Sequence, residues 1–149
     1  MRKLWILALA GALAIALGCG AGGGGGAESA AKDILEGVKK GDSKALIDHL
    51  DLKGMYEAQV PEEAREQMTY EKFEKLFTQG VAEEANKPAP EGFDYKILGS
   101  EVKGDATIVK VSVKEDKDAE WEESEVEFKK IDGKWKITAE GMQKLIEAE

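Results

Sequence analysis

The chain has 149 residues and a formal net charge of −9, with 30 acidic against 21 basic residues. Such a surface repels nucleic acid and anionic lipid headgroups, so the composition argues against both as partners of the folded part. The single Cys excludes an internal disulfide, and the length fits one domain with one hydrophobic core.

The first 18 residues have the organisation of a bacterial lipoprotein signal peptide. Two basic residues precede an apolar run over residues 4–17, which is shorter than the roughly 20 residues that a transmembrane helix needs. The residues just before Cys19 resemble the lipobox of bacterial lipoproteins, with Ala16 in the place usually held by Leu. We expect cleavage before Cys19 and lipid attachment to its thiol. The alternative is an ordinary secretory signal that is cleaved after Ala16.

Lipidation of Cys19 predicts a protein of the cell envelope that faces outside the cytoplasm, with the lipid bilayer as its first partner. Gly20 follows the Cys in place of the Asp that is associated with inner-membrane retention. This favours the periplasmic face of the outer membrane in a cell that has one, and a single-membrane cell stays open. Cleavage removes Arg2 and Lys3 and no acidic residue, so the net charge changes from −9 to −11.

Glycine dominates the residues after Cys19, which predicts a flexible coil that tethers the folded part to the lipid. The predicted organisation is therefore a signal peptide (1–18), a lipidated Cys with its tether (19–27) and one domain (28–149).

The first half of this domain has the spacing of amphipathic helices. Apolar residues at intervals of three and four predict a helix from about Glu28 to Lys40, followed by Gly41 as its C-terminal cap. Asp42 or Ser43 then caps a short second helix that carries Ala45, Leu46, Ile47 and Leu50.

A longer helical region follows. Pro61 suits the first position of a helix, and the region it opens reaches about Glu84, with a restart expected at Thr69. The segment 87–92, which contains two Pro residues, ends it.

The second half alternates between apolar and polar residues, which predicts four antiparallel strands. The strands begin near Phe93, Thr107, Glu120 and Trp135, and Asp132-Gly133 predicts a type I′ hairpin turn between the last two. Trp121 has the opposite parity to Val126 and Phe128, so we expect a bulge or strong bend in the third strand. A tail helix around Met142, Leu145 and Ile146 closes the domain.

Two segments carry a resemblance to a known family. These are the helix–Gly–Asp–helix step over residues 31–46 and the Ile-Asp-Gly-Lys-Trp-Lys-Ile segment over 131–137. The chain resembles nuclear-transport-factor-2-like proteins, and in particular the lipoprotein-associated family domain of unknown function 4878. The resemblance implies an α+β fold in which N-terminal helices pack on a curved C-terminal antiparallel sheet of about four strands. It also implies a cone-shaped pocket, which relatives use for catalysis or only for binding.

Five aromatic residues are candidates for the lining of such a pocket, although aromatic residues at helix and strand spacing more often fill a core. They are Phe73, Phe77, Tyr95, Trp121 and Trp135.

Catalytic and metal-binding patterns are weak. His49 is the single His, and neighbouring Asp48 and Asp51 point away from it by helical spacing, so a surface or half-buried role is expected. Asp116, Asp118, Glu120 and Glu127 have the spacing of a calcium loop, but Trp121 stands where that loop needs Gly. We therefore expect Glu123, Glu125 and Glu127 to form a solvated strand face, and we predict no cofactor or metal.

Two functions remain. The first is a tethered, non-catalytic binding domain for a small apolar ligand, a peptide or another envelope protein, with the oligomeric state open and a dimer included. The second is a dehydratase- or isomerase-type enzyme that uses an acidic residue in the pocket.

Overall fold

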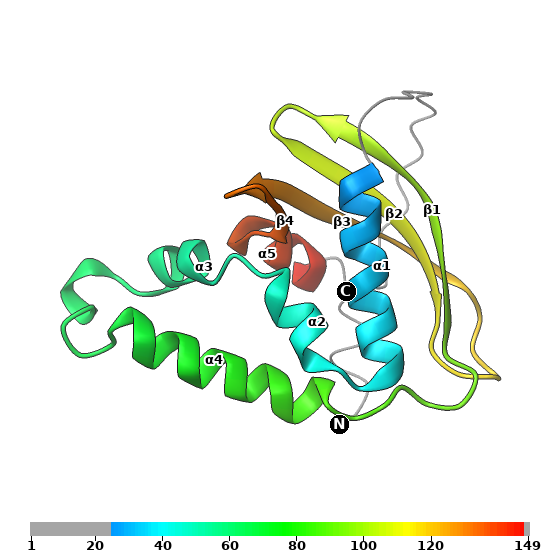
Figure 1. The fold of residues 1–149 in the computed structure, drawn as a ribbon, viewed down its shortest axis with the longest axis horizontal. Coiled ribbons are helices and arrows are strands. Elements are labelled where there is room, and N and C mark those ends of the chain that lie inside the picture. Colours follow the sequence, from blue (N-terminus) through cyan, green and yellow to red (C-terminus); the bar gives the residue numbers. More distant parts are fainter. Residues whose placement is uncertain (1–24, 148–149) are drawn as a thin grey trace.

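Helices come first in the structure and strands second, as the sequence predicts (Figure 1). The computed structural model describes residues 25–147. The elements are α1 (Gly25–Lys40), α2 (Ser43–Asp48), α3 (Leu52–Gln59), the 3₁₀ turn η2 (Glu62–Ala64), α4 (Tyr70–Ala85), β1 (Asp94–Lys103), β2 (Ala106–Lys114), β3 (Glu122–Ile131), β4 (Lys134–Ile137) and α5 (Ala139–Glu147).

Helix α1 begins three residues earlier than predicted, so it includes the end of the segment that the sequence assigned to the tether. Ala27 is fully buried and belongs to the hydrophobic core. Gly26 lies directly against the side chain of Trp135, because a Cβ added there would overlap the indole ring. Burial of Ala27 and the contact of Gly26 with Trp135 explain why the helix extends into a Gly-rich segment of poor intrinsic helix propensity.

Helix α2 has the predicted cap, in which the Asp42 side chain accepts a hydrogen bond from the backbone N–H of Lys44. Leu50 lies beyond this helix and forms an isolated parallel bridge with Ile137 of β4. Helix α3, which starts at Leu52 after an Asp51 cap, was not predicted from the sequence, and it contains a Gly, a residue of poor helix propensity. Leu52, Met55 and Tyr56 are its buried residues, so tertiary packing supports this short helix.

Pro61 does not open a long helix. It precedes only the 3₁₀ turn η2, and the long helix α4 begins after Thr69, whose hydroxyl accepts a hydrogen bond from the Lys72 N–H. The predicted restart at Thr69 is therefore confirmed as the true N-terminus of α4.

The strands form one antiparallel sheet in the order β1-β2-β3-β4, which confirms the predicted α+β class with helices on a four-stranded sheet. Figure 1 shows the strands bending behind α1. Val109, Val111 and Phe128 lie at the centre of the core and have no exposed surface.

The expected irregularity lies in a different strand. β2 and β3 pair in continuous register, whereas β1 shifts register between Ile97 and Gly99. Gly99 has a φ of 139°, which glycine adopts readily. The prediction of a bulge in the third strand is wrong because Trp121 lies just before β3 and need not share the core face with Val126 and Phe128.

The strand connections define two ends of the sheet. The β1–β2 turn at Gly104-Asp105 and the β3–β4 turn at Asp132-Gly133 lie at one end, which we call the hairpin end. Asp132 and Gly133 both have positive φ, 50° and 79°, which confirms the predicted type I′ turn. The β2–β3 connection, residues 115–121, lies at the other end, which we call the loop end (Figure 1).

Helix α1 runs along the sheet from the hairpin end to the loop end. Near its start, Glu28 accepts a hydrogen bond from the Ser100 hydroxyl at 2.6 Å. Near its finish, Lys39 lies 3.6 Å from Asp94 at the beginning of β1. The helix has 16 residues and is therefore about 24 Å long, which separates the two ends by a similar distance.

Candidate functional site

Phe73 and Phe77 belong to an aromatic cluster between α3 and α4. Their rings stack with centroids 5.5 Å apart, and Tyr56 contacts Phe73 at 5.6 Å and Tyr70 at 5.7 Å. The Tyr56 hydroxyl donates to the Met68 carbonyl at 2.9 Å. Phe73 is buried and Phe77 half-buried, so this cluster fastens α4 to α3.

Tyr95 lies on β1 under the second half of α1. Its hydroxyl donates to Oε1 of Glu36 at 2.5 Å, and Lys40 lies 3.2 Å from the other carboxylate oxygen. Desolvation and the hydrogen bond to Glu36 raise the pKa of Tyr95 well above its ordinary value. The same hydrogen bond, together with Lys40, lowers the pKa of Glu36. The pair stabilises the position of α1 on the sheet.

Trp121 is 40% exposed, and the Lys96 ammonium lies 3.8 Å from the centroid of its ring. Lys96 and Tyr95 are consecutive in β1, so their side chains point to opposite faces of the sheet. Trp121 therefore lies on the face opposite Tyr95 and α1. Its contact with Lys96 is a cation–π interaction at the molecular surface.

Trp135 is half-buried on β4, where Gly26 of α1 packs against it. Its backbone carbonyl accepts a hydrogen bond from Nδ1 of His49 at 2.9 Å. Trp135 therefore contacts the start of α1, and its side chain is only half-buried.

The five aromatic candidates do not converge. Among them, ring contacts join only Phe73 and Phe77. Tyr95 and Trp121 lie on opposite faces, and Trp135 lies at the other end of α1 from Tyr95. Trp121 has the opposite parity to Val126 and Phe128, and because β3 lacks the expected bulge it stays on the face opposite the core.

His49 has a carboxylate partner that the sequence analysis did not find. Its Nε2 lies 3.7 Å from Oδ2 of Asp33 on α1, while Nδ1 is held by the Trp135 carbonyl. Since a carbonyl only accepts, Nδ1 carries a proton. The imidazole is mostly buried, at 21% exposed. The ring links α1, the end of α2 and β4, so it supports the packing of these elements. Its arrangement with Asp33 is also that of an acid–base pair.

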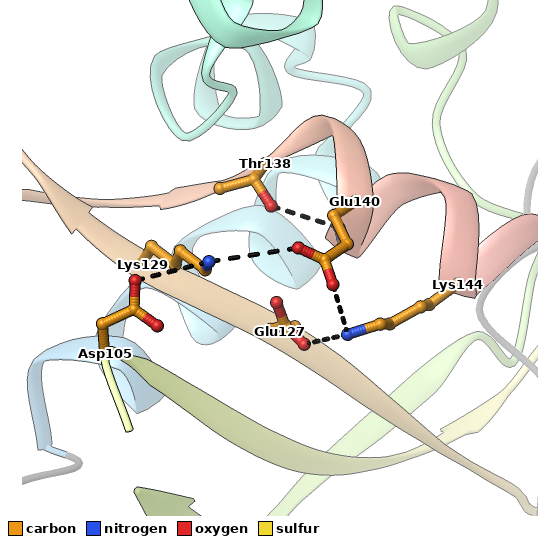
Figure 2. A network of polar contacts seen from close by, with 7 residues as sticks. Asp105, Glu127, Lys129, Thr138, Glu140 and Lys144 are labelled. Atoms are coloured by element: carbon orange, nitrogen blue, oxygen red, sulfur yellow. Dashed lines mark hydrogen bonds and ion pairs between the residues drawn. The ribbon is translucent and has the colours of Figure 1, made fainter. Parts of the chain in front are cut away.

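A second polar cluster fastens α5 to the sheet at the hairpin end (Figure 2). Glu127 of β3 is only 10% exposed at its side chain, and its Oε2 lies 2.6 Å from Nζ of Lys144. Lys144 also contacts Glu140 at 3.3 Å, and the hydrogen bond that it donates to Glu127 is the largest cause of its raised pKa. Lys129 lies 3.4 Å from Asp105. Glu127 is thus buried and paired, so its assignment to a solvated face is wrong.

In the acidic loop, one carboxylate binds the backbone of the same loop. Oδ1 of Asp116 accepts hydrogen bonds from the backbone N–H groups of Asp118 and Ala119. No group of three or more His, Cys, Asp or Glu side chains suited to a metal ion occurs in residues 25–147. Glu127, the twelfth position of the calcium-like spacing, contacts Lys144 instead.

The Asp33–His49 and Glu127–Lys144 contacts have no signal in the local sequence, because each contact joins residues from different elements.

Cys19, its signal peptide and most of its tether lie outside the described residues. No helix in the described part is long and apolar enough to cross a bilayer.

The family model described as "Domain of unknown function (DUF4878)" matches residues 17–138. The chain belongs to this family. The prediction of domain of unknown function 4878 is therefore confirmed, and the match reaches from just before Cys19 to the end of β4.

Among solved structures, the chain is similar to a "Putative NTF2-like transpeptidase" from Campylobacter jejuni, known from a crystal structure at 2.00 Å. The two are 25% identical, with a TM-score of 0.46, and the match covers 74% of this chain and 95% of the other. No curated protein matches the chain.

Proposed function

We propose that the protein is a lipid-anchored protein of the cell envelope whose domain binds another protein or a peptide through the surface around Trp121. The anchor is a diacylglyceryl group on the thiol of Cys19. The binding surface lies at the loop end, away from the start of α1.

The anchor is supported by the position of Cys19, the only Cys of the chain, directly after an apolar run that is too short to span a bilayer. Two acyl chains provide stable membrane attachment, which a single chain does not. The helix that follows begins at Gly25, so the folded domain starts close to the lipid.

The observation that carries the binding function is the exposed indole of Trp121 with a cation over its ring. Trp is enriched among the residues that dominate binding energy at protein interfaces. The ring already binds the Lys96 ammonium, so a partner that presents Lys or Arg can take the same place. The surrounding loop adds negative charge through Asp116, Asp118, Glu120 and Glu122.

The anchor is tested by the Cys19→Ser variant of the full chain, followed by membrane fractionation and mass spectrometry of the N-terminus. We expect the unmodified protein in the membrane fraction with a diacylated Cys19, and the variant in the aqueous fraction with its fold retained. A mature N-terminus at Leu17 with a free thiol would overturn this half of the proposal.

The binding surface is tested by photo-crosslinking in cells, with a benzophenone side chain at position 121 and, as a control, at position 76. Leu76 is 54% exposed on α4 and serves as a matched apolar site. We expect a discrete crosslinked partner from position 121 only.

Affinity of the purified domain for that partner is the quantitative test. Trp121→Ala should raise the Kd about 30-fold, the effect of losing a hot-spot residue, and Leu76→Ala should leave it unchanged. Equal effects from the two sites would refute the proposed surface.

A further inference from the structure

The β3–β4 hairpin carries a local excess of positive charge that the acidic composition conceals. Between residues 129 and 136 the chain has four Lys and one acidic residue, Asp132. Lys130 and Lys134 are exposed and Lys136 is half-buried. Lys129 is paired with Asp105 and Glu140, whereas the other three, the hairpin lysines, make no ion pair within residues 25–147.

The register of the hairpin brings two of its lysines together. Lys136 of β4 lies directly opposite Lys129 of β3, and like charges in such a cross-strand pair repel each other. Lys129 has its own carboxylate partners, so an anionic partner at this end would neutralise the hairpin lysines. Lys130 lies opposite Trp135, on the other face of the hairpin from Lys136. The positive charge therefore surrounds the tip of the hairpin and does not lie on one face alone.

The chain enters the domain at the same place. Gly26 packs against the indole of Trp135, the residue between Lys134 and Lys136. Six residue steps separate Cys19 from Gly25, and a fully extended chain covers about 20 Å in that length. A lipid on Cys19 therefore keeps Gly25 within about 20 Å of the membrane surface, and the hairpin lies beside the next residue, Gly26.

We infer that the β3–β4 hairpin docks on the anionic lipid headgroups of the bilayer that holds Cys19, through Lys130, Lys134 and Lys136. This inference rests on the proposed anchor and specifies the orientation of the domain on it. Long lysine side chains can reach headgroups from both faces of the hairpin, and each contributes through the negative surface potential of the membrane. α1 then points away from the bilayer and carries the loop end outward.

The test uses the chain from residue 19 onward, which contains every residue that the structure describes. Its single thiol is coupled to a maleimide lipid in vesicles, either of phosphatidylcholine or of an equal mixture of phosphatidylcholine and phosphatidylglycerol. Because coupling is chemical, the test is independent of lipidation in the cell, and a failed anchor is recognised separately by the Cys19→Ser experiment. With Trp121→Phe in the background, Trp135 is the only Trp and reports proximity to spin-labelled headgroups.

We expect strong quenching of Trp135 on the anionic vesicles, weak quenching on phosphatidylcholine, and a decrease with added salt. The triple variant K130Q/K134Q/K136Q should lower the docked-to-undocked ratio about 100-fold, since each Lys near an anionic surface contributes about a factor of five. The charge-matched control K75Q/K114Q/K117Q should leave it unchanged, because these residues lie on α4 and near the loop end.

Two results would overturn the inference. One is equal quenching on the two kinds of vesicle for the unsubstituted hairpin. The other is equal loss in the triple variant and in the control, which would indicate an effect of net charge alone. The salt titration of the unsubstituted hairpin gives an independent reading if a variant folds poorly.

Discussion

Each end of the sheet has a tryptophan between two charged residues, and these charges have opposite signs at the two ends. At the loop end Trp121 lies between Glu120 and Glu122, and at the hairpin end Trp135 lies between Lys134 and Lys136. Trp121 is 40% exposed on the face away from α1, whereas Trp135 is half-buried against the start of α1. The local pattern of a tryptophan between two charged residues therefore does not determine whether the ring is buried, because burial depends on whether α1 packs against it.

The largest expected effect is at Trp135. Trp135→Ala removes the contact with Gly26 and leaves space beside the start of α1. Full burial would make this cost about 3–5 kcal/mol, and for a half-buried ring we expect a loss of about 2–3 kcal/mol in the free energy of unfolding. Urea denaturation measures it. A loss below about 0.5 kcal/mol would show that the two tryptophans are equivalent and would remove the contrast between the ends.

A smaller effect is expected for the α5 attachment at the hairpin end. Lys144→Ala leaves the carboxylate of Glu127 almost buried without its ammonium partner, which should cost about 1–3 kcal/mol in unfolding free energy. The double variant Lys144→Ala/Glu127→Gln should recover part of this loss because it removes the unpaired charge. Lys75→Ala on α4 is the control. If the double variant is no more stable than the single one, the Glu127–Lys144 pair does not hold α5.

The contact of α1 at the loop end is tested by Tyr95→Phe, which removes the hydrogen bond to Glu36 and should cost about 1 kcal/mol at neutral pH. The raised pKa of Tyr95 means that the folded protein holds this proton more tightly than the unfolded chain. Its stabilisation is present below the ordinary tyrosine pKa of about 10 and is lost as the pH rises through the folded value.

The difference in unfolding free energy between the unsubstituted protein and Tyr95→Phe should therefore shrink above about pH 10. Chemical denaturation at several alkaline pH values measures this difference, and the other tyrosines and lysines titrate equally in the two proteins. A difference that stays constant or grows with pH would contradict the assigned hydrogen bond.

The smallest expected effect on stability is at Trp121. Trp121→Ala removes an exposed side chain and one cation–π contact, so the free energy of unfolding should change by no more than about 0.5–1 kcal/mol. Thermal unfolding followed by circular dichroism measures it. A loss as large as that of Trp135→Ala would mean that Trp121 supports the fold, and its proposed binding role would lose its basis.

The sequence by itself determined the elements that local chemistry specifies. Asp42 and Thr69 as helix caps, Asp132-Gly133 as the hairpin turn and the four alternating strands follow from propensity and periodicity, which act between residues near in the chain. The family followed from segments of the same local kind. The anchor at Cys19 is likewise a prediction from a local pattern, whereas the proposed binding surface rests on the exposure of Trp121 and its contact with Lys96.

Tertiary structure decided everything that depends on which elements meet. Helix α3 and the first turn of α1 have weak local signals and form because Met55 and Ala27 are buried by distant residues. Glu127 is buried rather than solvated, and its carboxylate pairs with Lys144 of α5. Asp33 and Gly26, both on α1, contact His49 and Trp135, which belong to later elements of the chain. Periodicity assigns a residue to a face of its own element, but burial and charge pairing depend on the neighbouring element, which only the folded chain supplies.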